Sequence, residues 1–440
     1  MNPFSLLLLL TPYAALLVLF STWASRHNRF FLGLLLLAFI WHPAPAQRSA
    51  RLGLATEIGR ILQSEVDSGK IPGAVVVIKK GEQVLLQKAY GYARKVDFDQ
   101  KPLPVPEKTS LQHLYDIASL TKVIGTTTSI MLLVDQGLIR VDDPVGKYIE
   151  AFQAPDKKAI TIRHLLTHTA GLYEWYPMYY RASNKQECYR LIGELPLRFP
   201  VGAQRRYSDL GFVLLGQVIE TVSGLPLERF VEENIFKPLG MEHTAYNPGS
   251  SGRFPKIAAT SHGNPYEKRM VYDASLGFQI KEIDPASWNG WRKYTLVGEV
   301  NDGNAWYANG GVSGAAGLFS TAGDLQLLVD MLKNKGMAAG RRFLSAKTIE
   351  TFLTPDKFNN GLGWVMDPSN PLLKNAPIGS FGHTGFTGTS ISVVPEYGLS
   401  VILLINRQNV GLLPSGAYYN VNPLRERVFG VAMKYGTKKG

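Results

Sequence analysis

Patterns typical of paired strands lie near both ends of this 440-residue chain. Residues 74–78 and 83–87 are short segments rich in apolar residues, and they are joined by the turn sequence Lys-Lys-Gly-Glu. Residues 389–394 and 399–405 repeat the arrangement around Pro-Glu-Tyr-Gly. Short apolar segments separated by turn residues predict β-hairpins. We therefore expect a single sheet to which both ends of the chain contribute strands.

Apolar residues at helical spacing flank these hairpins and fill the region between them. Helices are expected at residues 54–68, 120–136, 162–166, 210–222, 227–236, 322–333 and from Asn422-Pro423 to about Tyr435. Residues 247–304 are rich in Gly, Pro, Asn and Trp and are expected to form long loops. The pattern favours an α/β (α+β) fold, with an antiparallel sheet flanked by helices and a mainly helical lobe inserted in the middle.

Two apolar segments open the chain. Residues 4–23 are long enough to span a bilayer, which takes about 20 residues. Residues 30–41 suit the core of a signal peptide, which needs about 7–15 apolar residues. Residues 1–47 are therefore expected to be either a signal peptide, with the mature chain beginning near Gln47, or a retained membrane anchor.

Arg26 and Arg29 stand between these two segments, and such basic residues stay on the cytoplasmic side of a membrane. Both hypotheses therefore place the rest of the chain outside the cytoplasmic membrane. The expected location is the cell envelope, either periplasmic or secreted, or anchored in the inner membrane through the N-terminus.

Composition excludes several classes of protein. The formal net charge is +12, but the basic residues are scattered and no nucleic-acid-binding motif accompanies them, so no nucleic-acid partner is expected. Cys188 is the single cysteine, which excludes an internal disulfide and a cysteine-based zinc site. No neighbouring His or Asn suggests a role for Cys188 in catalysis, so we interpret it as an inert thiol.

Three short motifs contain residues able to do chemistry. Ser119 and Lys122 lie one turn apart at a helix start, where an amine can activate a hydroxyl nucleophile. Tyr207 precedes the apolar helix that follows Asp209, and its phenol could pass a proton between the serine and a leaving group. Residues 382–385, Gly-His-Thr-Gly, come directly before the C-terminal hairpin. Each motif alone is also typical of ordinary helix caps and turns.

In this order, the three motifs resemble those of the serine β-lactamase and penicillin-binding superfamily, in its class C-like branch. The resemblance runs from about Leu54 to Tyr435 and includes the segments 162–172, 236–241 and 316–321. Residues 301–307 and 310–314 are most similar to low-molecular-mass penicillin-binding proteins of the serine D-Ala-D-Ala carboxypeptidase type. The resemblance implies a β-lactamase/transpeptidase-like domain at 48–440. Its α/β lobe would comprise about residues 48–125 and 310–440, and its helical lobe about residues 126–309.

The resemblance also implies roles for individual residues. Ser119 would be the acylated nucleophile, Lys122 would help to remove its proton, and Tyr207 would act as a general base or proton shuttle; which of the two is the working base stays open. His383 and Thr384 would bind the substrate carboxylate, beside Gly385. The backbone N–H groups of Ser119 and Phe386 would form the oxyanion hole. No cofactor and no metal are implied.

Two residues depart from the family pattern. Asp209 stands where relatives usually have Asn, and an ionised Asp cannot donate a hydrogen bond to the substrate amide. Asp209 is therefore expected to be protonated, to face Lys122 or to contribute less to substrate binding. His383 stands where β-lactamases usually have Lys, which would make carboxylate binding sensitive to pH near neutrality. The second departure favours carboxypeptidases and esterases over a dedicated β-lactamase.

Other conspicuous residues are interpreted as structural. His164 and His168 have a metal-like i, i+4 spacing, but the resemblance favours packing. Gly310, Gly311, Gly314 and Gly317 resemble a nucleotide-binding loop without the Gly-Lys-[Ser/Thr] that should follow. An aromatic cluster after His168 is either a wall that contacts substrate or a packed loop; it comprises Tyr173, Trp175, Tyr176, Tyr179 and Tyr180.

The leading hypothesis is a cell-envelope D-Ala-D-Ala carboxypeptidase or penicillin-binding protein that acts on peptidoglycan stem peptides, with β-lactams as covalent ligands. A second hypothesis keeps the same acyl-enzyme on Ser119 but assigns it to small esters or amides, other peptides or β-lactams. A third, motivated by Asp209, is a non-catalytic relative that binds the cell wall.

Overall fold

The computed structural model describes residues 45–437. Of these, residues 53–437 belong to one compact unit, and residues 45–52, the first residues of helix α3 (Pro45–Asp67), belong to a second. The apolar segments predicted at 4–23 and 30–41 lie outside the described residues. Within the described part, no single helix is both long and apolar enough to span a membrane. Asp209–Ser223 and Leu227–Leu239 reach that length and composition only as a pair, bent by 75°.

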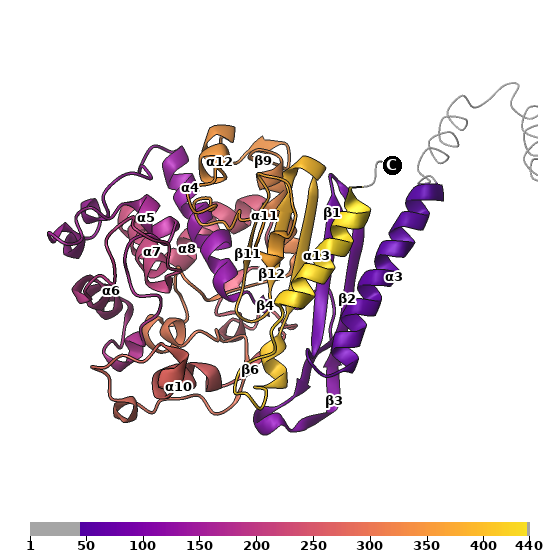
Figure 1. The fold of residues 1–440 in the computed structure, drawn as a ribbon, viewed down its shortest axis with the longest axis horizontal. Coiled ribbons are helices and arrows are strands. Elements are labelled where there is room, and N and C mark those ends of the chain that lie inside the picture. Colours follow the sequence, from indigo (N-terminus) through magenta and orange to yellow (C-terminus); the bar gives the residue numbers. More distant parts are fainter. Residues whose placement is uncertain (1–44, 438–440) are drawn as a thin grey trace, which may run out of the picture. The chain divides into compact units, whose positions relative to one another are not determined.

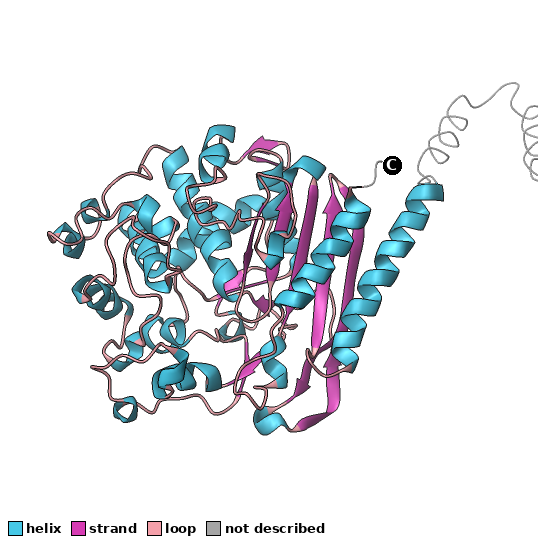
Figure 2. Ribbon diagram, viewed as in Figure 1, coloured by secondary structure: helices cyan, strands magenta, loops and turns pink. Residues whose placement is uncertain are grey.

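A six-stranded antiparallel sheet contains the strands from both chain ends, in the order β11-β12-β13-β1-β2-β3 (Figures 1 and 2). The strands are β1 (Gly73–Lys80), β2 (Gln83–Val96), β3 (Pro102–Lys108), β11 (Phe381–Thr384), β12 (Ser390–Val394) and β13 (Leu399–Ile405). The first strand of the N-terminal hairpin pairs directly with the last strand of the C-terminal hairpin, from Ala74 opposite Ile405 to Lys80 opposite Leu399. Both predicted hairpins and their common sheet are confirmed.

Both faces of the central strands are buried, which explains their continuous apolar sequence. Ala74, Val76 and Ile78 pack on one face with α3 and the closing helix α13 (Asn422–Gly436). Val75 and Val77 point to the opposite face and join the larger core of the helical region. In Figure 1, α3 and α13 cover one side of the sheet and the remaining helices lie on the other.

The helical region between the two hairpins packs around one large apolar core, and a smaller apolar cluster lies around Phe254, Ile257 and Phe319. Its helices are α4 (Thr128–Asp135), α5 (Ile162–Leu166), α6 (Lys185–Glu194), α7 (Asp209–Ser223), α8 (Leu227–Val231), α9 (Lys237–Leu239), α10 (Pro265–Tyr272), α11 (Ala322–Lys333) and α12 (Ala346–Phe352). Short strands complete it, namely β4 (Tyr115–Asp116), β5 (Ala245–Tyr246), β6 (Ala259–His262), β7 (Thr295–Val297), β8 (Leu318–Ser320), β9 (Met337–Ala338) and β10 (Arg341–Arg342).

The helix expected at 120–136 is present as a continuous helical stretch over residues 121–135. It follows a 3₁₀ turn at Ala118–Leu120, and its first part, Lys122–Thr127, is π-helical before α4 begins. Other local features differ from expectation. The predicted long loop at 247–304 contains the paired strands β6 and β7 and the helix α10. Helix α10 begins at Pro265, a residue that suits the first position of a helix. Strand β3 escaped prediction because it contains three prolines, which a strand tolerates only at the edge of a sheet.

Candidate active site

Ser119 lies in the sharp turn that leads from strand β4 into the first core helix. Ala118, just before it, has a left-handed backbone (φ 45°), which costs a residue with a side chain about 1–2 kcal/mol. The carboxylate of Asp116 holds this turn, because its Oδ1 accepts a hydrogen bond from the Ala118 N–H at 2.8 Å. Ala118 and Leu120 are buried while Ser119 is half-buried, so the turn directs the serine away from the core.

The side chain of Lys122 is completely buried beside this serine. Its ammonium donates to Ser119 Oγ at 3.1 Å and to the Ala315 carbonyl at 2.8 Å, and it pairs with Asp209 Oδ1 at 2.7 Å. Burial alone would lower the pKa of Lys122, but the neighbouring Asp209 and Tyr207 raise it above its usual value. Lys122 is therefore a cation at neutral pH, with three oxygen partners.

Tyr207 stands on the other side of the same ammonium, in the extended segment that precedes α7. Lys122 Nζ lies 5.1 Å from the centre of the Tyr207 ring. Burial raises the pKa of Tyr207, while the charge of Lys122 and hydrogen bonding with Ser119 and Lys122 act against the rise. The phenol is therefore protonated at neutral pH and touches both members of the Ser-Lys pair.

Asp209 begins helix α7, whose N-cap is Ser208. Its backbone N–H donates to the Glu174 carbonyl at 3.0 Å, and its carboxylate turns toward Lys122. The sequence left open whether Asp209 is protonated, faces Lys122 or binds substrate less strongly. In this structure it faces Lys122, as one half of an ion pair whose other half is buried.

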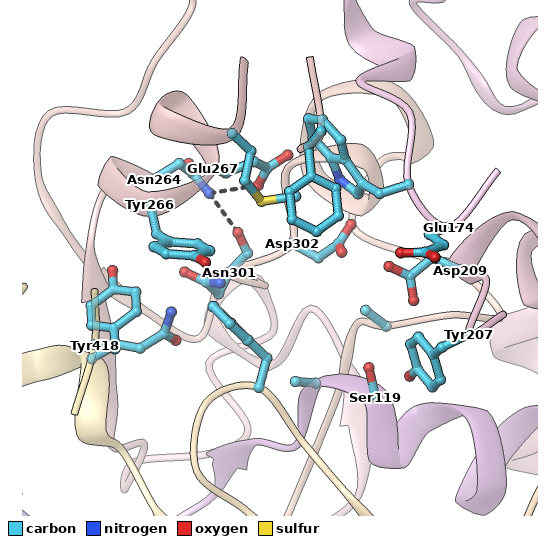
Figure 3. Close-up of a pocket in the computed structure, with 17 residues that line it drawn as sticks. Ser119, Glu174, Tyr207, Asp209, Asn264, Tyr266, Glu267, Asn301, Asp302 and Tyr418 are labelled. Carbon is cyan, nitrogen blue, oxygen red and sulfur yellow. Dashed lines mark hydrogen bonds between the residues drawn. The ribbon is translucent and has the colours of Figure 1, made fainter. Parts of the chain in front are cut away.

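These residues open onto a cavity of about 300 Å³ (Figure 3). Ser119, Tyr207 and Asp209 line one end together with Glu174, and Tyr266 and Tyr418 lie at the opposite end. The remaining lining residues are Ala118, Trp175, Asn264, Glu267, Met270, Phe278, Asn301, Asp302, Ala316, Phe386 and Gln408. None of these lining residues is a Lys, Arg or His, and four carry carboxyl groups.

The predicted Gly-His-Thr-Gly motif occupies the end of edge strand β11, but only Phe386 beyond it lines the cavity. His383 is buried, and its Nδ1 bonds to the Thr384 carbonyl at 2.9 Å. Burial and the charge of Lys122 lower the pKa of His383 to about 3. The expectation of a histidine that changes charge near neutrality was therefore wrong, because this ring is neutral throughout the physiological range.

The turn after β11 carries Phe386, which lines the same cavity as Ser119. Gly385 donates its N–H to the Thr389 carbonyl at 2.8 Å, and Thr387 Oγ1 donates to the Asp116 carbonyl at 2.7 Å. A Cβ atom on Gly385 would lie 2.4 Å from the carbonyl oxygen of Ile117, so only glycine fits. The loop and the Ser119 turn are thus joined directly.

Apart from Asp209, the sequence did not single out the acidic residues around the cavity as site residues. Burial raises the pKa of Glu267, and the adjacent Asp302 raises it further; Asp302 is raised by burial and by Asp209. Burial also raises the pKa of Asp116 to about 6. Buried acids with displaced pKa values gather at functional sites. The residues that flank these acids in the sequence show no helical or strand periodicity that would predict a shared site. The acids become neighbours only when the chain folds.

The remaining candidates occupy other positions. Of the aromatic cluster, Trp175 lines the cavity, Tyr176 and Tyr179 are buried in the core, and Trp175 packs edge-to-face against Phe278 at 6.0 Å. Cys188 is buried, and burial raises the pKa of its thiol to about 12. His164 and His168, which have a metal-like spacing in the sequence, have different partners. The side chain of His164 takes part in the N-terminal capping box of α5, whereas the ring of His168 contacts Tyr207.

Comparison with known proteins gives consistent matches. A family model described as Beta-lactamase matches residues 58–421. A protein of Salmonella heidelberg named "Putative D-alanyl-D-alanine carboxypeptidase" is 33% identical over 395 residues, which cover 81% of this chain and 87% of the relative. Proteins with the same name from Salmonella enteritidis and Salmonella typhimurium match equally well.

Solved structures agree on the fold. The octameric penicillin-binding protein homologue from Pyrococcus abyssi has a TM-score of 0.63 at 21% identity, covering 87% of this chain and 77% of its own. A penicillin-binding protein homologue from Caulobacter crescentus has a TM-score of 0.62 at 19% identity, covering 87% and 97%. EstCE1, a hydrolase with promiscuous acyltransferase activity, has a TM-score of 0.62 at 22% identity, covering 86% and 98%. The expected fold class is confirmed.

Proposed function

Because this chain belongs to the beta-lactamase family of serine hydrolases, we propose that it cleaves the terminal D-Ala from peptidoglycan stem peptides through an acyl-enzyme on Ser119. One observation carries the proposal: the Lys122 ammonium lies 3.1 Å from Ser119 Oγ at the wall of a cavity. The Salmonella relatives, named for D-alanyl-D-alanine carboxypeptidase activity, support the choice of substrate.

In the proposed reaction, Ser119 Oγ attacks the carbonyl carbon of the scissile amide and a tetrahedral oxyanion forms. The backbone N–H groups of Ser119 and Phe386, two residues that line the cavity, would stabilise that oxyanion. Removing one such donor typically slows a reaction by about 10²–10³-fold. Collapse of the intermediate breaks the C–N bond and leaves an ester on Ser119. Water then attacks the ester carbonyl, and the shortened peptide departs as a carboxylic acid.

We assign the proton transfer to Tyr207 rather than to Lys122. Lys122 is already protonated and has no free electron pair with which to accept the serine proton. The Tyr207 oxygen can accept that proton while its own phenolic proton passes to the departing nitrogen, so no free phenolate is required. Lys122 stabilises the negative charge that develops on Ser119 Oγ and on the phenol oxygen during this transfer.

Covalent labelling of the whole chain by a fluorescent penicillin tests the acyl-enzyme. We expect one adduct in the wild type, none in Ser119→Ala and normal labelling in Ser369→Ala, an exposed serine away from the cavity. Release of D-Ala from a D-Ala-D-Ala peptide should follow the same order. Labelling of Ser119→Ala at the wild-type rate would remove Ser119 from the mechanism.

A second function is favoured by the charge of the cavity. The substrate of a carboxypeptidase carries a carboxylate, yet no cationic side chain lines this cavity, and His383 is neutral. The same acyl-enzyme chemistry would therefore also suit small esters or amides without a carboxylate. Ester turnover without D-Ala release, abolished in Ser119→Ala, would decide for this second function.

We also propose that the catalytic unit works in the cell envelope, outside the cytoplasmic membrane. Cell-wall peptides are found there, and the apolar segments at 4–23 and 30–41 support export. N-terminal sequencing of the exported protein distinguishes the two forms of the proposal. A start near Gln47 would indicate a cleaved signal peptide, and an intact Met1 would indicate an anchor. Activity confined to the cytoplasm would contradict both.

A further inference from the structure

His168 occupies a backbone position that would suit glycine better. It follows helix α5 with a left-handed conformation (φ 58°), and only 4% of its surface is exposed. The loop around it is fixed, because Thr169 donates its N–H to the His164 carbonyl at 2.9 Å and Gly202 donates to Thr169 at 2.8 Å. A residue with a bulky ring that keeps an unfavourable backbone conformation indicates that the contacts of its side chain have a function.

The contacts of His168 surround Tyr207. Its carbonyl accepts the N–H of Arg206 at 2.9 Å, and its ring Nδ1 accepts the N–H of Ser208 at 3.0 Å. The ring itself lies against Tyr207, with 4.5 Å between the ring centres. Three consecutive residues, with Tyr207 in the middle, are therefore attached to one histidine.

The charge state of His168 fits this role. Nδ1 can accept a hydrogen bond only when it carries no proton. Burial lowers the pKa of His168 well below its usual range, and the nearby charges of Arg205 and Lys122 lower it further. The lowered pKa favours the neutral ring, whose Nδ1 accepts the Ser208 N–H at 3.0 Å.

We propose that His168 is a positioning residue that holds the Tyr207 phenol in place for proton transfer at Ser119. The segment that carries Tyr207 is neither helix nor strand, so no regular backbone ladder fixes its direction. Tyr207 must reach both Ser119 and the departing nitrogen, and a small rotation of the segment would separate it from one of them. The inference rests on the proposed acyl-enzyme mechanism.

Two substitutions separate the contributions of His168. His168→Gly keeps the left-handed backbone and removes the ring, whereas His168→Asn tolerates the backbone and keeps an acceptor atom near the position of Nδ1. His164→Asn is the matched control. His164 has the same acceptor contact, Nδ1 to the Thr161 N–H at 3.1 Å, and it does not line the cavity.

We expect the acylation rate constant of His168→Gly to fall about 10–100-fold with KM changed less than about threefold, because positioning affects the transition state more than binding. His168→Asn should recover part of the loss, and His164→Asn should keep the wild-type rate. In a Tyr207→Phe background, His168→Gly should slow acylation less than about threefold further, because the residue that it positions is already lost. An equal loss in both backgrounds, or no loss in either, would overturn the inference.

A spectroscopic measurement tests the same inference without turnover. 3-Fluorotyrosine placed at position 207 of the full chain reports its surroundings through the ¹⁹F signal. We expect the signal to shift or broaden in His168→Gly and His168→Asn but not in His164→Asn, and an unchanged signal in folded His168 variants would reject positioning. If the ¹⁹F signal changed in the His168 variants as expected but the wild type showed no acylation, the proposed function would fail. The structural role of His168 would still stand.

Discussion

Lys122 and Asp209 form an ion pair beside Ser119, the proposed nucleophile. The sequence pattern left the protonation state of Lys122 open, since burial alone would favour the neutral amine. The structure adds Asp209 at 2.7 Å, and the net effect is a raised pKa for Lys122. The aspartate that departs from the family pattern therefore raises the pKa of this lysine through its negative charge, which an asparagine does not carry.

Replacing Asp209 by Asn should move the alkaline limit of activity. Without the carboxylate, the pKa of Lys122 falls, so Lys122 loses its proton at a lower pH than in the wild type. Because we assign Lys122 a role as a cation, the acylation rate should begin to decline at a correspondingly lower pH. A profile of acylation rate against pH from 6 to 11 measures the shift.

The control for this prediction is Lys185→Ala, which breaks an ion pair of the same 2.7 Å length with Glu220, away from the cavity. Its profile should match the wild type. If Asp209→Asn instead acylated faster at neutral pH, Lys122 would act as a neutral base and our assignment to Tyr207 would be wrong.

At the scale of the elements, the loop after β11 must approach the Ser119 turn very closely. Gly385→Ala places a Cβ atom 2.2 Å from Thr389 Oγ1, so the loop has to move and Phe386 moves with it. We expect acylation to slow at least about 10-fold and the melting temperature to fall, as in other overpacked sites. Penicillin labelling and thermal unfolding measure the two effects.

Gly430→Ala serves as the matched substitution for Gly385→Ala. Gly430 lies in helix α13, and a Cβ atom there meets nothing within 4 Å. Alanine should stabilise the protein by about 0.5–1 kcal/mol, since glycine is a poor helix former, and should leave acylation unchanged. Equal behaviour of the two alanine variants would contradict a close-approach role for Gly385.

Asp116 joins three segments that are distant in sequence. Its carboxylate accepts the N–H groups of Ala118 at 2.8 Å and Asn301 at 2.7 Å, and its carbonyl accepts Thr387 Oγ1. Asp116→Ala leaves both N–H groups without this acceptor, so we expect a loss of about 1.5–3 kcal/mol in the free energy of unfolding. Acylation should also slow about 10-fold or more, because Ala118 belongs to the turn that positions Ser119, the proposed nucleophile.

Asp135→Ala separates stability from catalysis in this prediction. Asp135 likewise accepts a backbone N–H, that of Ser345 at 3.2 Å, but at the start of α12. Urea unfolding should show a loss of the same order for both variants, while only Asp116→Ala should acylate slowly. An unchanged acylation rate in Asp116→Ala would mean that the turn holds Ser119 without this carboxylate.

At the scale of the whole molecule, folding places several carboxyl groups in one partly closed cavity. Burial and mutual repulsion raise the pKa values of Glu267 and Asp302 above those of free carboxyl groups. Between the ordinary and the raised pKa, the folded state holds protons that the unfolded state has already released. Stability is therefore greatest at and below the ordinary carboxyl range and declines as the pH rises through the raised values.

Glu267→Gln should flatten this decline, because glutamine cannot ionise. We expect the free energy of unfolding of the wild type to fall between pH 5 and pH 9 by at least about 1.4 kcal/mol more than that of the variant, the equivalent of one pKa unit. Urea unfolding at four pH values measures the difference. Glu150→Gln, an exposed position, is the control and should follow the wild type. Parallel curves for Glu267→Gln and the wild type would show that Glu267 ionises normally.

Elements with a strong local pattern were predictable from the sequence. The hairpins around residues 79–82 and 395–398 and the closing helix at Asn422–Gly436 follow from apolar spacing and turn residues, which act over a few neighbours. Strand β3 and helix α6 were missed, because prolines in the first and the polar sequence of the second hide the pattern. Pairing with β2 holds strand β3, and the burial of one face holds helix α6.

The sequence by itself determined the residue types at the site and their order along the chain: Ser119 with Lys122, then Tyr207, then the segment at 382–386. Only the tertiary structure decided their charge states and their partners. Lys122 is charged because Asp209, 87 positions away in the sequence, pairs with it. His383 is neutral because it is buried in strand β11, and His168 reaches Tyr207 across a loop. Local spacing reflects contacts between neighbours, whereas burial and charge depend on segments that meet only after the chain has folded.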